Sequence, residues 1–196
     1  MKKNYSKFFL KKIQQVTQEI NYQKVDKLAY DISKIRKNSG RLFFLGVGGS
    51  AANSSHAVND FRKLCKIESY SPLDNVAELT ARINDEGWNS SLSEWLKVSK
   101  LKSKDAIFIF SVGGGNRQKK VSMNLISAID YARKVKAKVF GVVGKKSGYT
   151  YKYGDNVIHI PEVEKSKVTP ISEAYQAVIW HCLVSHPVLQ AKKTKW

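Results

Sequence analysis

Two pairs of ionisable side chains have spacings that could support chemistry. His56 and Asp60 lie four residues apart, so they share one face if that segment is a helix. Glu173 and His181 lie eight residues apart, just over two helical turns, and also fall near one face. Imidazole and carboxylate groups transfer protons as general acids and bases, and they supply nitrogen and oxygen ligands to zinc. The two pairs come from distant parts of the chain, so only the fold can bring them together.

Structural roles are the alternative for His56, Asp60 and His181. A single histidine on a helix is usually structural or exposed, and Asp60 by itself could be a surface charge. His181 follows Trp180 in an apolar segment and could be a hydrogen-bonded core histidine. His159 and His186 have no partner at a helical spacing, so we interpret both as structural.

Two glycine-rich segments, residues 46–50 and 111–116, each follow a short apolar run and precede a helical pattern. Backbone N–H groups in such a turn, at the start of a helix, can bind an anion. Ser50 and Ser111 add hydroxyl donors suited to a compact monophosphate, and Asn116 adds an amide. Neither segment matches the dinucleotide fingerprint or ends in Gly-Lys-Ser/Thr, so no nucleotide cofactor is expected. A simple tight turn between strand and helix remains the alternative for each segment.

The elements that must position these residues alternate between strands and helices. Spaced apolar residues over 5–37 predict one long or two short amphipathic helices, ended by Asn38, Ser39 and Gly40. The strands and helices expected after them cover residues 41–45, 50–65, 106–110, 118–134, 138–143, 157–160 and 172–185. This alternation favours an α/β fold with a parallel sheet that helices cover on both faces.

The length of 196 residues favours one domain, and no apolar run approaches the roughly 20 residues that cross a bilayer. The basic N-terminus lacks the apolar stretch of a signal peptide. We therefore expect a cytoplasmic protein without membrane partners. Cys65 and Cys182 are too few for a disulfide framework, and we expect both to be buried, reduced thiols.

The formal net charge is +18. A basic surface can bind nucleic acid by releasing counterions from phosphates. The lysines are scattered, however, and no RNA- or DNA-binding signature accompanies them, so a nucleic-acid partner is not expected. Three interpretations stay open: a solvated lysine-rich surface, non-specific binding of polyanions, and steering of anionic substrates towards a site.

Four segments, in order, resemble motifs of SIS-domain phosphosugar isomerases, and above all of phosphoheptose (sedoheptulose 7-phosphate) isomerases. They are GVGGSAANSSH at 46–56, LDNVAELTA at 73–81, NDEG at 84–87 and SVGGGN at 111–116. The resemblance covers about residues 41–186. It implies a flavodoxin-like three-layer α/β/α sandwich with a parallel sheet. It also implies a homotetramer with active sites between subunits and, in many members, a zinc ion. We divide the chain into an N-terminal helical segment, 1–40, and a phosphosugar-binding domain, 41–190.

The resemblance also assigns site residues. Asp60 and His181 would be catalytic. The metal ligands would be His56, Asp60, Glu173 and His181. The substrate and its phosphate would be bound by Gly48, Gly49, Ser50, Asp74, Asn75, Ser111, Gly113, Gly114, Gly115 and Asn116. Tyr175 and Gln176 are further candidate substrate contacts. For Asp74 and Asn75 the competing role is a helix N-cap, since Val76 onward is compatible with a helix.

The chain departs from the family pattern at several positions. Asp60 and Glu173 stand where the family has glutamate and glutamine, and Val47 replaces an asparagine of the first loop. In the second loop Ser111 is the one hydroxyl left, because Val112, Gly113 and Asn116 occupy positions where hydroxyls are expected. Backbone amides and Ser50 should still bind a phosphate, whereas activity and sugar specificity could be altered.

The sequence therefore predicts an aldose–ketose isomerase of a phosphorylated sugar, acting by acid–base chemistry through an enediol. The reaction expected from the resemblance converts sedoheptulose 7-phosphate to D-glycero-D-manno-heptose 7-phosphate. The alternative is a non-catalytic phosphosugar-binding sensor or regulatory protein. The sequence leaves open which sugar is used and whether a metal is bound.

Overall fold

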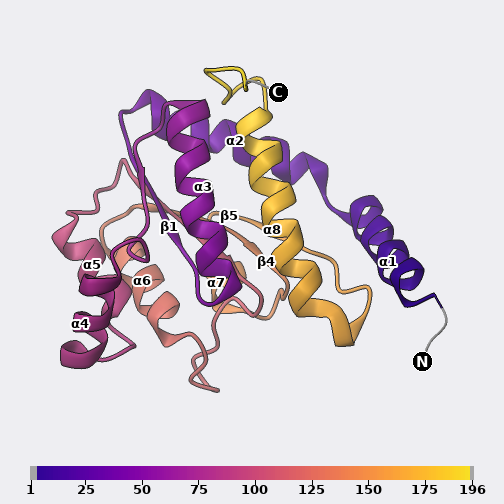
Figure 1. Cartoon of the computed structure of the whole chain (residues 1–196). Coiled ribbons are helices and arrows are strands. Elements are labelled where there is room, and N and C mark those ends of the chain that lie inside the picture. Colours follow the sequence, from indigo (N-terminus) through magenta and orange to yellow (C-terminus); the bar gives the residue numbers. More distant parts are fainter. Residues whose placement is uncertain (1–3, 195–196) are drawn as a thin grey trace.

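The computed structural model describes residues 4–194 and contains one five-stranded, entirely parallel sheet between two layers of helices (Figure 1). The strands are β1 Leu42–Leu45, β2 Ser69–Tyr70, β3 Ala106–Ser111, β4 Lys138–Val143 and β5 Asn156–His159. Their order across the sheet is β2-β1-β3-β4-β5. The α-helices are α1 Tyr5–Glu19, α2 Tyr22–Lys37, α3 Gly49–Cys65, α4 Val76–Glu86, α5 Ser91–Val98, α6 Met123–Lys134, α7 Tyr149–Tyr153 and α8 Val168–Ser185. The predicted α/β/α architecture with a parallel sheet is confirmed.

The two faces of the sheet bury two separate apolar cores. Alternate residues of β1, such as Phe44 and Phe43, point into opposite cores, as strand geometry requires. The first core joins α2, α3 and α8, and the second joins α5 and α6. Leu28 and Ile32 of α2 are fully buried in the first core, so this helix packs with the domain that follows it. The proposed boundary at residue 40 stays a prediction.

Local signals explain most helix ends. Asn21 separates α1 from α2, because its side chain accepts a hydrogen bond from the backbone N–H of Lys24 and caps α2. The N-terminal region thus contains two helices. Gly40 follows α2. A Cβ atom on this residue would lie 2.0 Å from the carbonyl oxygen of Lys104, so only glycine fits at position 40. The expected helix at 118–134 begins later, at Met123, because Asn116 and Val121 pair in a short turn before it.

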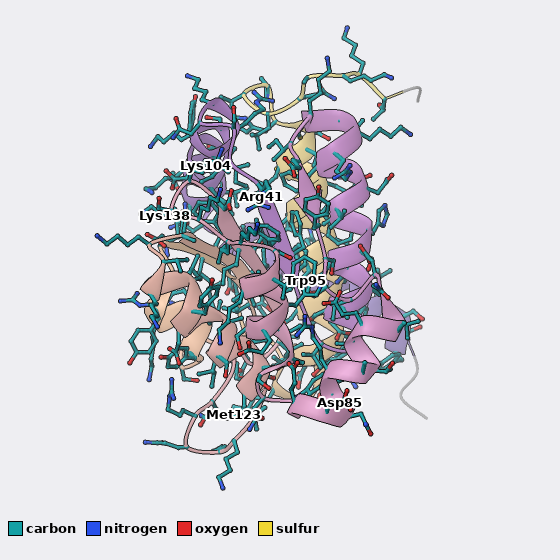
Figure 2. All side chains as sticks on the ribbon, turned by 90° about the vertical axis from the view of Figure 1, so that its left-hand side faces the viewer. Arg41, Asp85, Trp95, Lys104, Met123 and Lys138 are labelled. Carbon is teal, nitrogen blue, oxygen red and sulfur yellow. The ribbon has the colours of Figure 1, made fainter. Side chains whose placement is uncertain are left out.

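Basic residues gather where the strands begin. Arg41 precedes β1, Lys104 precedes β3 and Lys138 opens β4, and Figure 2 shows the three at one end of the molecule. Helices α2 and α6 also end near this edge and carry basic residues in their last turns. Positive charge at a helix C-terminus interacts favourably with the helix dipole. Part of the charge excess therefore has a local structural reason. Among the described residues, no helix has both the length and the apolar composition needed to cross a bilayer.

The two cysteines differ in accessibility, which corrects the expectation that both are buried. Cys65 is fully buried at the end of α3, whereas Cys182 lies on the exposed side of α8. Burial raises the pKa of the Cys65 thiol to about 12, so it is almost entirely protonated at neutral pH. The apolar composition of α8 does not predict that the side chain at position 182 is exposed to solvent.

This difference predicts selective thiol labelling. In the native protein at pH 8, a disulfide reagent should modify Cys182 and leave Cys65 unmodified, because only Cys182 is accessible. Desolvation also raises the pKa of Cys182, so its labelling should become faster as the pH rises. Absorbance of the released chromophore should report one thiol per native chain and two per unfolded chain. A Cys182→Ser variant should show no fast reaction. Fast labelling of Cys65 in that variant would contradict the buried position.

Candidate active site

The two glycine loops lie side by side at one edge of the sheet. Residues 46–50 follow β1 and residues 111–116 follow β3, and these two strands are hydrogen-bonded neighbours. The chain continues from β1 to β2 on one side of the sheet and from β3 to β4 on the other. In sheets of this order, ligands bind at the carboxyl ends of the two strands where the connections diverge. The loops predicted to bind phosphate therefore occupy the expected position.

The first loop leads directly into the start of α3. Gly48 has a φ of +63°, and α3 begins at Gly49 without a side-chain cap. The first N–H groups of a helix have no partner within the helix, so they are available to an anion. Ser50 is buried, and its Oγ accepts a hydrogen bond from Nε2 of Gln176 at 3.0 Å. This contact leaves the hydroxyl proton of Ser50 free to be donated.

Helix α8 supplies further polar groups to the first loop. A Cβ atom on Gly49 would lie 2.7 Å from Oε1 of Glu173, so the Glu173 carboxylate packs directly against the loop. Asn53 donates from Nδ2 to the backbone oxygen of Glu173 and to Oε1 of Gln176. Gln176 thus lies at the loop. Tyr175 instead donates to the carbonyl oxygen of Ile13, and so it anchors α1 rather than lining this loop.

The second loop is shaped largely by its own backbone. The backbone N–H of Gly114 donates to Oγ of Ser111 at 3.0 Å, and Gly114 and Gly115 have φ values of +70° and +81°. A Cβ atom on Gly113 would meet no atom within 4 Å, so this position faces open space. Asn116 accepts a hydrogen bond from the backbone N–H of Lys119, which closes the turn after the loop.

The alternatives for Asp74 and Asn75 are now separated. Asn75 is the N-cap of α4, with Oδ1 accepting from the backbone N–H of Glu78 at 3.2 Å. Asp74 accepts a short hydrogen bond from the hydroxyl of Ser55 on α3. Asn75 therefore caps α4, Asp74 connects the segment before α4 to α3, and the substrate contacts expected of both stay predictions.

A cluster of three residues joins α3 to α8. One ligand atom from each of His56, Asp60 and His181 lies within 4.8 Å of the others. Nε2 of His56 is 3.6 Å and Nε2 of His181 is 3.5 Å from Oδ2 of Asp60. Asp60 is buried, with 8% of its surface exposed, while both histidines are exposed. We call these three residues the His–Asp–His cluster.

Neighbouring side chains fix the Asp60 carboxylate. Trp180 donates from Nε1 to Oδ2 at 3.1 Å, and Asn59 donates from Nδ2 to Oδ1 at 3.0 Å. The His181 ring is oriented by a 2.8 Å hydrogen bond between Nδ1 and the backbone oxygen of Ala177, which leaves Nε2 to face Asp60. The sequence offered no signal for Trp180 or Asn59 beyond their positions beside His181 and Asp60.

The structure brings together three of the four predicted metal ligands. Helices α3 and α8 run side by side in the same direction (Figure 1), with Glu173 near the start of α3 and His181 near Asp60. Eight residues of helix correspond to about 12 Å at about 1.5 Å per residue. Within one chain, Glu173 therefore lies at the glycine loop and not at the His–Asp–His cluster.

The cluster has the donor chemistry of a metal site. Two imidazoles and a carboxylate match the three protein ligands of many catalytic zinc sites, which leave a position open for substrate. The hydrogen bond from the other ring nitrogen of His181 to a backbone oxygen is the outer contact that usually orients a ligating histidine. The residues present therefore fit a divalent metal ion.

Phosphoheptose isomerases are among the proteins similar to this chain. No family model matches the chain. It is 30% identical over 158 residues to the lincomycin biosynthesis protein LmbN of Streptomyces lincolnensis, and these residues span 75% of the chain but only 56% of that protein. It is 28% identical over 166 residues to the probable phosphoheptose isomerase of Thermoplasma volcanium, covering 82% of the chain and 79% of that protein. These similarities support an SIS-domain phosphosugar isomerase family for this chain.

A solved structure extends the similarity to the fold. The phosphoheptose isomerase of Neisseria gonorrhoeae superposes with a TM-score of 0.77 over 91% of this chain and 94% of its own, at 18% identity. The superposition covers 91% of the chain, which is more than the part that contains the four sequence motifs. In this chain the glycine loops and the His–Asp–His cluster are separate groups of residues.

Proposed function

We propose that this chain is an aldose–ketose isomerase that converts sedoheptulose 7-phosphate to D-glycero-D-manno-heptose 7-phosphate. The observation that carries the proposal is the buried Asp60 carboxylate held between two histidines, His56 and His181. The names of the relatives from Thermoplasma volcanium and Buchnera aphidicola, both phosphoheptose isomerases, support the choice of substrate. The free thiols Cys65 and Cys182 are typical of a reducing compartment, and we assign the protein to the cytoplasm.

The reaction moves two protons. Asp60 removes a proton from C1 of the ketose, which forms an enediolate, and returns a proton to C2. His181 transfers the second proton between the oxygens on C1 and C2, so that the hydroxyl becomes a carbonyl and the carbonyl becomes a hydroxyl. The bonds from Trp180 and Asn59 hold the Asp60 carboxylate in place while it exchanges its proton. Atoms and charge balance over the cycle, because both protons are returned.

The phosphate would be bound at the two glycine loops. The free N–H groups at the start of α3 and the hydroxyl of Ser50 are donors there, and the open space at Gly113 leaves room for the ligand. The second loop has a single hydroxyl, Ser111, whose Oγ accepts from Gly114 and whose proton can still be donated. Backbone groups must therefore provide most of the binding at this loop.

The length of the substrate supports a site shared between two subunits. Asp60 is eleven residues beyond Gly49, about 16 Å along α3. The eight bonds from C1 to the phosphorus of a heptose 7-phosphate, at about 1.5 Å each, total about 12 Å, and the zigzag chain spans less than that. A phosphate at the loop of one chain would therefore leave C1 far from Asp60 of the same chain. In the assembly we propose, a homotetramer, the cluster of one subunit faces the glycine loops and Glu173 of another.

A metal ion would be held by His56, Asp60 and His181, and Glu173 of a neighbouring subunit would complete the set. Nε2 of His181 would then be a ligand, so the proton transfer assigned to His181 applies to the metal-free site. When bound, such an ion would polarise the oxygens on C1 and C2. We expect metal-stripped protein to bind about one zinc ion per chain, and His56→Ala to weaken binding more than about tenfold, because it removes a direct ligand. Competition with a chromophoric chelator measures both values. Equal affinity in the variant would place any zinc ion elsewhere.

Turnover tests the proposed function. Proton NMR of the protein with sedoheptulose 7-phosphate should show aldose signals growing at the expense of the ketose. The second candidate, a non-catalytic phosphosugar sensor, is favoured by the shorter Asp60 in place of glutamate and by the single hydroxyl of the second loop. A rise in melting temperature with this sugar phosphate but no aldose would support the sensor. If the protein shows no turnover of this sugar phosphate and is not stabilised by it, both functions are contradicted.

A further inference from the structure

The His–Asp–His cluster forms one wall of a cavity of about 540 Å³. The cavity is lined by His56, Asp60, Lys63, Leu64, His181, Lys192, Lys193 and Thr194. Lys63 comes from α3, one turn beyond Asp60, and the other two lysines come from the segment that follows α8. The reacting groups of the proposed isomerase therefore share a cavity with three lysine residues.

The segment after α8 is held in place by backbone contacts. Arg36 on α2 donates to the carbonyl oxygens of Val188 and Leu189, at 2.9 and 2.7 Å. Further along, the backbone N–H groups of Ala191 and Lys192 both donate to the carbonyl oxygen of Leu64, at 2.8 and 3.0 Å. These bonds attach the segment to the end of α3. They explain why Lys192 and Lys193 lie at the cavity although they follow the last helix.

The charges in this cavity do not cancel. Among the residues that line the cavity, Asp60 has the one carboxylate. Both oxygens of this carboxylate already accept hydrogen bonds, from Trp180 and Asn59. Within residues 4–194, Lys63, Lys192 and Lys193 form no ion pair with an acidic side chain. A concave site lined by charge of one sign concentrates ions of the opposite sign. The cavity is therefore suited to an anion.

We propose that Lys63, Lys192 and Lys193 form an oxyanion site at the reacting end of the sugar, separate from the phosphate-binding loops. This inference rests on the proposed function for its natural ligand, the enediolate formed from the sugar. The negative charge of an enediolate is spread over two neighbouring oxygens, and fixed positive groups stabilise charge that develops during a reaction. The chemical class that the site binds is a compact anion with two adjacent oxygens.

Oxalate is a suitable probe, because it is a small dianion with adjacent oxygens and carries no phosphate. We would titrate oxalate into metal-stripped protein in the presence of a chelator and follow the ring proton NMR signals of His56 and His181. The expected result is a saturable shift of these signals. In K63Q/K192Q/K193Q the oxalate affinity should fall by about tenfold, because three exposed charges are lost. The charge-conserving variant K192R/K193R should retain most of the affinity.

A matched control removes the same charge elsewhere. The variant K7Q/K11Q/K165Q replaces three exposed lysines on α1 and just before α8, and it should bind oxalate like the unaltered protein. Unshifted histidine signals in the unaltered protein would overturn the proposal. Equal weakening of binding in the test and control variants would also overturn it, since the effect would then come from net charge alone.

The enzymatic measurement separates this proposal from the proposed function. If sedoheptulose 7-phosphate is turned over, K63Q/K192Q/K193Q should lower kcat by about tenfold and change KM much less, because the charge is stabilised mainly in the transition state. An unchanged kcat would overturn the enediolate role. If no turnover occurs in the unaltered protein, the proposed function fails, and the oxalate titration alone decides whether the cavity is an oxyanion site.

Discussion

Replacing Asp60 with asparagine is expected to slow the isomerisation by about 10²- to 10⁴-fold, the usual contribution of a general base. The amide has the shape of the carboxylate but cannot take a proton from carbon. It can still accept the hydrogen bond from Trp180, so the fold should be retained. Initial rates measured by NMR at saturating sedoheptulose 7-phosphate give the effect on kcat.

The matched control is Asp60→Glu, which keeps the carboxylate and restores the residue type that the family resemblance implies at this position. A displacement of the carboxylate by about one methylene group can cost about 10²-fold. We therefore expect this variant to keep measurable activity. A D60N variant as active as the unaltered protein, with a similar melting temperature, would exclude Asp60 as the base.

The second large effect is restored activity in mixed oligomers. Gly113→Asp should abolish phosphate binding, because it places a carboxylate in open space at the loop, where like charges cost several kcal/mol. If the glycine loops of one subunit work with the cluster of another, inactive G113D and inactive D60N each supply what the other lacks. Co-expressed or refolded together, they should give activity well above the sum of the separate variants.

Two controls make this result specific. Gly113→Ala adds no charge and meets no atom, so it should remain active alone. A chain that carries both G113D and D60N, mixed with D60N, should stay inactive, because no intact cluster is present in the mixture. Activity that never rises in mixtures, although mixed oligomers are shown to form, would place the loops and the cluster of a single chain in one site.

Apolar patterning predicted the fold well because both faces of the sheet are buried. The runs in β1, β3 and β4 have almost no exposed residues, and such segments read as continuous apolar stretches. The start of α6 was harder to predict, because residues 116–121 form a turn whose composition is compatible with a helix. The outward position of Cys182 depends on how α8 packs, which its apolar composition hides.

The candidate site was only partly predictable, for a geometric reason. The spacing of Glu173 and His181 places them near one helix face but about 12 Å apart along it. Only the packing of α8 against α3 shows that Glu173 lies at Gly49 and His181 at Asp60. His56, Asp60 and His181 meet because α3 and α8 run in the same direction, which no local pattern reveals. Lys192 and Lys193 reach the cavity through backbone bonds to Leu64, and these depend on the finished tertiary structure.

The most direct test of the central claim, that Asp60 removes a proton from the carbon beside the sugar carbonyl, is deuterium exchange. The protein would be incubated with sedoheptulose 7-phosphate in D₂O, with and without added zinc, and the sugar would be followed by NMR. We predict deuterium at the carbon next to the carbonyl with the unaltered protein, and its loss with D60N. Binding of the sugar phosphate without any exchange, or exchange that persists unchanged in D60N, would contradict this account.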